Sequence, residues 1–182
     1  MTVLALSSFA QAEVVSGTGI ISRVVDGDTY WIKADSIHVW RKIVTAARKG
    51  TYRWKSRTFK MRLLNVDTEE SVHRNKSKNT VFGKLTSRLV KKELSGRAVS
   101  FVCHGVGYYG RTLCSIYAGK RDYGRSLVKR GLSAYVTKYG KHFLNHKQYV
   151  AAEHYARLHR LGIWSKNKIQ YIEQLLRSKH GH

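Results

Sequence analysis

The amino-acid sequence predicts an α+β protein in which helices cover a small barrel of about five strands. Three observations favour this class. Short apolar runs bounded by turn residues occupy the first two thirds of the chain, and two pairs of them form hairpins. Segments with apolar residues at helical spacing are interleaved with the later strands and dominate the last third. The 182 residues are 42% hydrophobic, which suits one domain with its own core.

Five segments are expected to form strands. The first two make a hairpin around the turn Asp26-Gly27-Asp28, and the last two make a hairpin around the glycine-rich, aromatic segment 104–110. The third strand lies between the hairpins and is rich in apolar residues. In chain order the predicted strands are 19–25, 29–33, 59–66, 99–103 and 112–117.

Three helices are expected to pack on the barrel, over residues 82–94, 126–130 and 145–161. The first carries apolar residues close to the 3.6-residue period. Each of the three ends within two residues of a glycine, as helix C-termini often do. Asn145 is a suitable N-cap for the third helix.

Two basic segments lie outside this scheme. Residues 35–57 are too many for a hairpin turn, and residues 166–182 form a tail with a helical pattern in its middle. Both are interpreted as additional phosphate-binding surface. For Trp40, Tyr52 and Trp54 two alternatives stay open: they stack on nucleobases, or they close a small satellite core under the insertion.

The charge of the chain points to a polyanionic partner. Lys and Arg total 34 against 11 Asp and Glu, a net charge of +23. Nucleic acid is the first partner to consider and an anionic membrane surface the second, while a basic surface without a specific partner is the alternative. No segment approaches the about 20 apolar residues of a membrane span.

The N-terminus is typical of the end of a secretory signal. Residues 2–10 are apolar or small, and Ala10-Gln11-Ala12 is a small-x-small cleavage pattern. No Lys or Arg precedes Arg23, so the positive region of a complete signal is missing, and an apolar first strand is the alternative. We expect residues 1–12 to be a signal remnant and the protein to be secreted or periplasmic.

The two cysteines support the same expectation. Cys103 and Cys114 flank the turn of the second hairpin, which places them opposite each other and predicts a cross-strand disulfide. Two buried free thiols are the alternative. A disulfide is typical of an exported protein.

The few acidic residues form two clusters, and each cluster follows a predicted strand. The first is Asp26 and Asp28, and the second is Asp67, Glu69 and Glu70. Like charges this close destabilise one another unless a cation lies between them, and carboxylates with a backbone carbonyl are what calcium or magnesium takes. Taken alone, each cluster is better interpreted as a turn or as the end of a strand. Together they favour a metal site.

Two arginines are placed to serve phosphodiester chemistry. Arg62 lies on the strand that leads into the second acidic cluster, and Arg111 begins the last strand. Cleavage of a phosphodiester needs donors aimed at the phosphate, and the planar, permanently charged guanidinium suits this.

These motifs resemble the signature segments of the staphylococcal-nuclease-like (thermonuclease) family. The resemblance covers about residues 19–165, which we take as the domain, and implies an OB-fold barrel of five strands with three packed helices. The matching segments are 25–29 (Val-Asp-Gly-Asp-Thr), 62–70, 109–111, 127–132 and 162–164.

The resemblance implies a calcium site and a nuclease activity. Asp28 and Asp67 would bind one calcium ion with the backbone carbonyl of Thr68, and Asp26 would lie behind them and shape the turn. Glu70 is the candidate general base. The family cleaves DNA and RNA, single strands more readily, and leaves 3′-phosphate ends.

The resemblance also assigns the donors and the nucleotide pocket. Arg62 and Arg111 would neutralise the phosphate and the leaving oxygen. Tyr109 and Tyr135 match aromatic positions that line the nucleotide pocket. Arg125 repeats the Tyr-Gly-Arg pattern, but Arg111 is preferred because it precedes a strand.

Two departures from the family pattern are notable. Glu69 stands where the family usually has proline, which would either loosen the loop carrying Glu70 or bring a second carboxylate near the metal. The insertion 35–57 is longer than the hairpin of compact members.

Two rival functions stay open. One is an OB-like module that binds nucleic acid without cutting it, and the other is a cationic protein acting on anionic membranes, for which the tail helix is short. We expect a monomer.

Overall fold

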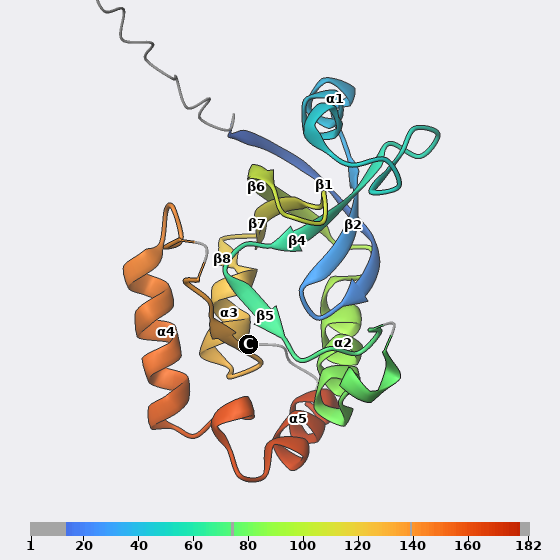
Figure 1. Cartoon of the computed structure of the whole chain (residues 1–182). Coiled ribbons are helices and arrows are strands. Elements are labelled where there is room, and N and C mark those ends of the chain that lie inside the picture. The colour runs from blue at the N-terminus through green and yellow to red at the C-terminus, as the bar shows by residue number, and fades with distance from the viewer. Residues whose placement is uncertain (1–13, 74, 139, 179–182) are drawn as a thin grey trace, which may run out of the picture.

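The computed structural model describes residues 14–73, 75–138 and 140–178, and the predicted signal remnant, residues 1–12, lies outside them. Five strands form a closed barrel in the order β4-β2-β1-β6-β7, and pairing of β4 with β7 completes the circle (Figure 1). The barrel strands are β1 (Val15–Asp26), β2 (Thr29–Ala34), β4 (Thr58–Leu63), β6 (Ala98–Val106) and β7 (Thr112–Ala118). The predicted OB-like α+β fold is therefore confirmed.

The pairing of β4 with β7 closes the barrel and determines which residues are neighbours at its end. Strands β4 and β7 run parallel, with Arg62 opposite Leu113, and β2 pairs antiparallel with β4, with Thr29 opposite Arg62. A closed barrel has no free edge between these strands, so the register of β4 is fixed from both sides. Arg62 consequently stands between the turn after β1 and the start of β7.

The barrel interior is filled by aliphatic and aromatic side chains. Ile21 and Ile32 are fully buried and paired across β1 and β2, and Met61 is also fully buried. The rings of Phe59 and Phe101 meet edge to face with centroids 5.3 Å apart. Burial of this kind stabilises a core by about 1.5–3 kcal/mol per large side chain, so the barrel provides a rigid support for the loops at its ends.

The described residues include four further short strands, two of which belong to the barrel sheet. Strands β3 (Tyr52–Arg53) and β8 (Arg121–Asp122) lengthen the barrel sheet at its two ends. A separate two-stranded sheet joins β5 (Val66–Thr68) to β9 (Ser133–Tyr135). Strand β5 carries Asp67 and leads directly to Glu69 and Glu70 of the second acidic cluster.

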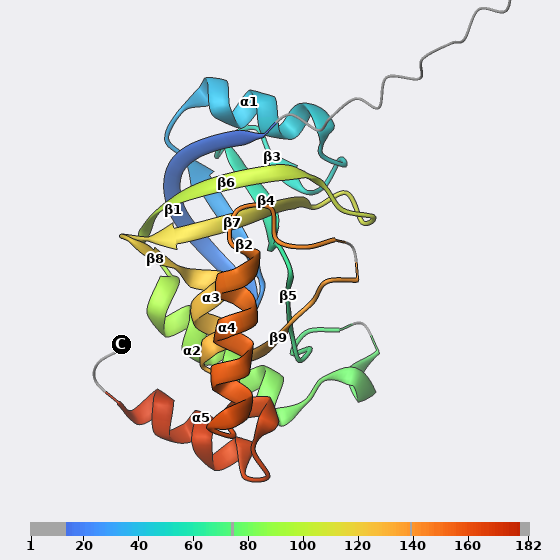
Figure 2. The ribbon, with the colours of Figure 1, turned by 90° about the vertical axis from the view of Figure 1, so that its left-hand side faces the viewer.

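Five α-helices surround the barrel. The three expected helices are α2 (Val81–Leu94), α3 (Tyr123–Lys129) and α4 (His146–Leu158), and two more come from the insertion, α1 (Ile37–Ala46), and from the tail, α5 (Lys168–Arg177). Helix α1 lies at the opposite end of the molecule from α5, which packs against α2 (Figures 1 and 2). Two short 3₁₀ turns, Lys76–Lys78 and Gly162–Trp164, complete the elements. Within the described residues no helix is long and apolar enough to cross a membrane.

The insertion folds as a small satellite core. Trp40 of α1 is fully buried, and its ring meets those of Tyr52 and Trp54 at 6.2 and 4.6 Å. A fully buried Trp40 cannot stack on a nucleobase. Trp40 therefore belongs to a satellite core and not to a base-stacking surface. Trp54 is 62% exposed.

Cys103 and Cys114 form the predicted disulfide. They are directly opposite in the pairing of β6 with β7, with Cα atoms 4.0 Å apart. Both are buried among the core residues. The bond holds the base of the hairpin whose tip carries Tyr109 and Arg111.

We expect the double substitution Cys103→Ala/Cys114→Ala to lower the free energy of unfolding by about 2–3 kcal/mol, because it frees a short loop in the unfolded chain. Urea denaturation of the oxidised protein, the reduced protein and the variant measures this. Reduction should bring the wild type close to the variant and leave the variant unchanged. Equal stability of the oxidised protein and the variant would contradict the prediction.

Candidate active site

The turn after β1 buries two carboxylates side by side. Asp26 and Asp28 are 6% and 3% exposed. Asp26 accepts hydrogen bonds from the hydroxyls of Ser71 and Ser87 at 2.7 and 2.6 Å and from the amide of Gly27 at 2.8 Å. Because Ser71 directly follows Glu70, Asp26 fixes the loop that carries the second acidic cluster. The supporting role of Asp26 at a metal site stays a prediction.

Asp28 is held from three directions. It accepts hydrogen bonds from the Thr29 hydroxyl at 2.8 Å and from the Thr68 amide at 3.2 Å. The Nη2 atom of Arg62 lies 3.0 Å from its second oxygen. Burial raises the pKa of Asp28 to about 6, although the Arg62 charge works in the opposite direction. Above that pH the buried carboxylate is an anion that needs a cation nearby.

Arg62 connects the two acidic clusters. Its guanidinium contacts the carboxylates of both Asp28 and Asp67, so one cation is shared between two anions. The side chain of Asp67 is 59% exposed, whereas that of Asp28 is 4% exposed. Asp28 and Asp67 therefore flank a site that is buried at Asp28 and open to solvent at Asp67.

Thr68 lies against the same turn. A Cβ atom on Gly27 would come within 2.6 Å of the Thr68 hydroxyl, so this close approach requires glycine. The Thr68 hydroxyl is buried and has no hydrogen-bond partner among the described residues. The turn Asp26-Gly27-Asp28 is thus fitted to the strand that carries Asp67 and Thr68.

Glu70 stands on a loop that is fastened to α2. Its backbone carbonyl accepts a hydrogen bond from the Thr80 amide at 3.0 Å. A Cβ on Gly83 would come within 2.4 and 2.6 Å of the carbonyl oxygens of Glu70 and Glu69, so glycine lets the first turn of α2 approach the loop. Glu70 is partly buried.

Arg111 reaches the acids from the hairpin between β6 and β7. Its Nη1 atom donates to the Thr29 hydroxyl at 3.2 Å, and Thr29 in turn donates to Asp28. Burial and the nearby Arg62 charge lower the pKa of Arg111. The structure therefore places Arg111 near the acids, whereas Arg125 lines a different cleft.

The insertion supports the Arg111 turn. The carbonyl of Gly110 accepts hydrogen bonds from the Arg48 amide and the Thr51 hydroxyl, both at 3.2 Å. Gly110 has a φ of 73°, and a Cβ there would lie 2.1 Å from the Cβ of Arg48. Only glycine fits both the backbone conformation and the contact. The insertion is therefore joined to the same turn as Arg111.

The two tyrosines expected in a nucleotide pocket differ in exposure. Tyr109 is 66% exposed, and the Arg111 guanidinium lies 5.6 Å from its ring centroid. Tyr135 is 8% exposed, and its hydroxyl accepts from the His142 amide and bonds the His146 ring, both at 2.8 Å. Tyr109 is accessible for stacking on a base. The binding role of Tyr135 stays a prediction.

Glu69, which stands where the family usually has proline, connects the loop that carries Glu70 to the tail helix α5. Its carboxylate pairs with Lys168 of α5, whose ammonium lies 5.3 Å from the Phe82 ring centroid. The second carboxylate oxygen of Glu69 is buried without a hydrogen-bond partner. Sequence reasoning missed Lys168, Ser71 and Ser87 because their contacts depend on how distant segments meet.

A hard divalent cation fits the donor set at the open side. Within the described residues no three His, Cys, Asp or Glu side chains gather into a metal cluster. The expected ligands are instead two carboxylates, Asp28 and Asp67, and the Thr68 carbonyl. Oxygen donors of this kind suit calcium or magnesium. The four carboxylates of Asp26, Asp28, Asp67 and Glu70 outnumber the two guanidiniums of Arg62 and Arg111, an excess of negative charge that a cation would balance.

The fold and these residues define an OB-like barrel with a carboxylate and arginine site at one end. Residues 60–166 match the family model described as staphylococcal nuclease homologue, and the chain belongs to that family. The match includes Arg62, Asp67, Glu70 and Arg111. The family match begins after the turn that carries Asp26 and Asp28. In the folded barrel Asp28 of this turn contacts Arg62, which lies inside the match.

A curated relative is similar over most of the chain. It is the probable endonuclease LCL3 of Pyricularia oryzae, 26% identical over 168 residues, which are 84% of this chain. The aligned part spans 62% of the relative's length.

Replacing Lys168 by Met should lower the free energy of unfolding by about 1–2 kcal/mol, because it leaves the partly buried Glu69 carboxylate without its charged donor. Lys166→Met is the matched control, since Lys166 is exposed in the same segment. Urea denaturation of both variants measures the difference. Equal losses would show that the pair with Glu69 contributes nothing.

Proposed function

We propose that this protein is a metal-dependent nuclease that hydrolyses phosphodiester bonds of DNA and RNA and leaves 3′-phosphate ends. The proposal rests on one observation: the guanidinium of Arg62 contacts both Asp28 and Asp67. Arg111 is linked to Asp28 through the Thr29 hydroxyl. Membership of the staphylococcal nuclease family and the similarity to a probable endonuclease support it.

The metal would be one calcium ion. Asp28, Asp67 and the backbone carbonyl of Thr68 would hold it. When bound, the ion supplies a positive charge that polarises a phosphoryl oxygen. The buried position of Asp28 keeps one ligand fixed, and the exposed position of Asp67 leaves room for the substrate phosphate.

The arginines would bind and stabilise the reacting phosphate. Arg62 and Arg111 each carry several N–H donors, and negative charge increases on the phosphoryl oxygens as the attacking water adds. Both terminal nitrogens of Arg62 contact Asp28, and one of them also contacts Asp67. Arg62 would exchange part of these contacts for the phosphate oxygens. Arg111 would donate to the phosphoryl oxygens or to the leaving 5′ oxygen.

Glu70 would act as the general base. It would accept a proton from the attacking water while the bond to the 5′ oxygen breaks, so the phosphate stays on the 3′ side. The contacts of its loop with Asp26, through Ser71, and with Thr80 would hold the carboxylate in position. Tyr109 would stack on a neighbouring base, which favours single strands.

The domain and its location are also proposals. We propose a nuclease domain over residues 19–165, because β1 and β2 complete the barrel that the family match enters at Lys60. The disulfide and the apolar N-terminus support a secreted or periplasmic protein. The insertion 35–57 and helix α5 of the tail would support the loops of Arg111 and Glu70. We propose that the protein acts as a monomer.

Cleavage of single-stranded DNA by the purified protein tests the activity. We expect cleavage with calcium that stops in EDTA, with magnesium as the comparison ion. Product ends are identified by their resistance to extension until a 3′-phosphatase is added. Tight binding without cleavage under any metal would instead favour the non-catalytic OB-like binding module.

Substitution of the site residues tests the roles. We expect Glu70→Gln and Arg111→Ala each to lower kcat by about 10²–10³-fold, because each removes an interaction made in the transition state. Arg97→Ala is the control, since Arg97 is exposed and outside the site. Activity retained in Arg111→Ala but lost in Arg125→Ala would mean that Arg125 is the catalytic arginine.

A further inference from the structure

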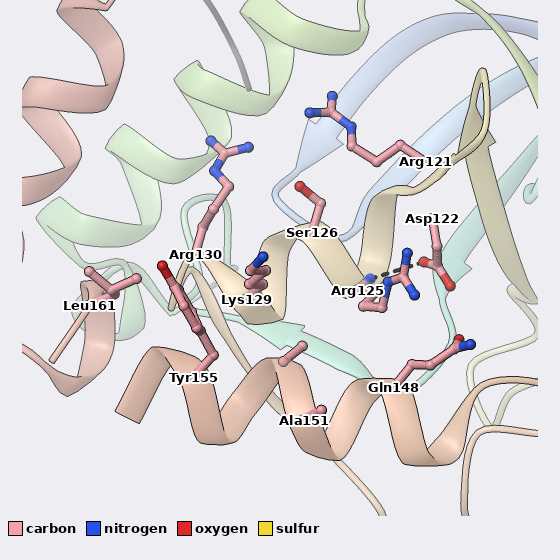
Figure 3. A pocket seen from close by; sticks show the side chains of 11 residues that line it. Arg121, Asp122, Arg125, Ser126, Lys129, Arg130, Gln148, Ala151, Tyr155 and Leu161 are labelled. Atoms are coloured by element: carbon pink, nitrogen blue, oxygen red, sulfur yellow. Dashed lines mark hydrogen bonds between the residues drawn. The ribbon is translucent and has the colours of Figure 1, made fainter. Parts of the chain in front are cut away.

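A second basic site lies between α3 and α4. A cleft of about 740 Å³ runs between these helices, and four cations line it: Arg121, Arg125, Lys129 and Arg130 (Figure 3). None of its lining residues belongs to the candidate active site described above. In Figure 3 the cations lie along α3 and the strand before it, and α4 forms the facing wall.

The wall from α4 is neutral and open. Gln148, Ala151 and Tyr155 line it at intervals of three and four residues, so they share one face of the helix. The small side chain of Ala151 leaves space in the middle of the cleft. The Tyr155 ring stacks on the His159 ring with centroids 4.0 Å apart, and the Lys129 ammonium lies 4.8 Å from its centroid.

The cleft keeps a net positive charge. Its one lining acid, Asp122, is 3% exposed, and its oxygens accept from the Arg125 amide, the Tyr149 hydroxyl and the Asn145 amide group. Arg130 is paired with Glu93 at 2.9 Å. The four cations and the two acids, Asp122 and Glu93, together leave a net charge of +2 around the cleft. An extended anion would supply the missing negative charges.

The spacing of the cations suits a repeating anion. Arg121, Arg125 and Lys129 follow one another at intervals of four residues. Arg125 and Lys129 lie on α3, where this interval corresponds to about 6 Å along the axis, comparable with the separation of successive phosphates in an extended single strand. Arg121 lies on β8, directly before the helix. Arginine and lysine bind phosphate oxygens well, and the neutral wall would not repel them.

We propose that the cleft between α3 and α4 binds the sugar–phosphate backbone of a single-stranded polynucleotide at phosphates other than the one being cleaved. This rests on the proposed function only in taking a polynucleotide as the substrate. The cleft would raise the affinity for long strands over short ones. It would contribute phosphate contacts and therefore salt dependence, without reading base sequence.

Two variants test the cleft by different means. Arg125→Gln/Lys129→Gln removes two of its cations, and Ala151→Glu fills it and adds a carboxylate while leaving the cations in place. Lys91→Gln/Arg97→Gln is the control, because these two residues are exposed and line no part of the cleft. It removes the same total charge as the first variant. Thermal unfolding confirms that each variant is folded.

Binding to poly(dT) of about thirty nucleotides is measured in EDTA over a range of salt concentrations. We expect the negative slope of log affinity against log salt to become shallower by about 1.4 in Arg125→Gln/Lys129→Gln, which is about 0.7 for each lost phosphate contact. The control should change much less, and Ala151→Glu should weaken binding more than the control does. If either cleft variant binds like the control, the proposal is wrong.

The failure of this proposal differs from the failure of the proposed function. Binding in EDTA needs no cleavage, so the cleft can be tested even if the wild type cuts no substrate. Conversely, cleavage that depends on Glu70 can be intact in a protein whose cleft variants bind poly(dT) like the control.

Discussion

The shared guanidinium of Arg62 is the interaction on which the site depends. It contacts Asp28 from the first hairpin and Asp67 from the small second sheet, and these segments are far apart in sequence. Two carboxylates placed this close repel each other, and one is almost fully buried. The guanidinium offsets this repulsion, while the Thr68 amide also bonds Asp28 and the Ser71 hydroxyl bonds Asp26. The barrel makes the contact possible because β2 and β7 fix Arg62 from both sides of β4.

Two elements outside the barrel hold the loops around that centre. The insertion bonds to Gly110, next to Arg111, through Arg48 and Thr51. The tail helix bonds to Glu69, next to Glu70, through Lys168. Both contacts involve the backbone or side chain beside a candidate catalytic residue, not the residue itself. The basic segments that look like additional surface in the sequence are therefore also structural supports of the site.

Much of the fold was predictable because its signals are local. Alternating apolar residues and the Asp-Gly-Asp turn predicted the first hairpin, and glycines predicted the ends of the helices. The predicted strand 59–66 is in fact two strands, because Asn65 has a φ of 59° and breaks the extended chain between β4 and β5. Helix α1 was missed, although Ser36 caps it and Trp40 and Val44 have helical spacing.

The candidate site was predictable as a set of residues but not as an arrangement. Acids in a strongly basic chain, and the family resemblance, selected the residues. The shared role of Arg62 and the engagement of Glu69 by Lys168 depend on the register of β4 and on the docking of α5. The difference in exposure between Tyr109 and Tyr135 likewise depends on packing. Long-range contacts of this kind leave no pattern in a single sequence.

Calcium titration calorimetry of the wild type, Asp67→Asn and Asp35→Asn tests the central claim most directly. Asp35 is exposed, bonded to Thr18 at 2.7 Å and apart from the site, so it is the matched control. The account predicts that the wild type and Asp35→Asn bind one calcium ion and that Asp67→Asn loses this binding while remaining folded. Unchanged calcium binding in Asp67→Asn, or no binding by the wild type, would contradict a metal site built on the carboxylates that Arg62 joins.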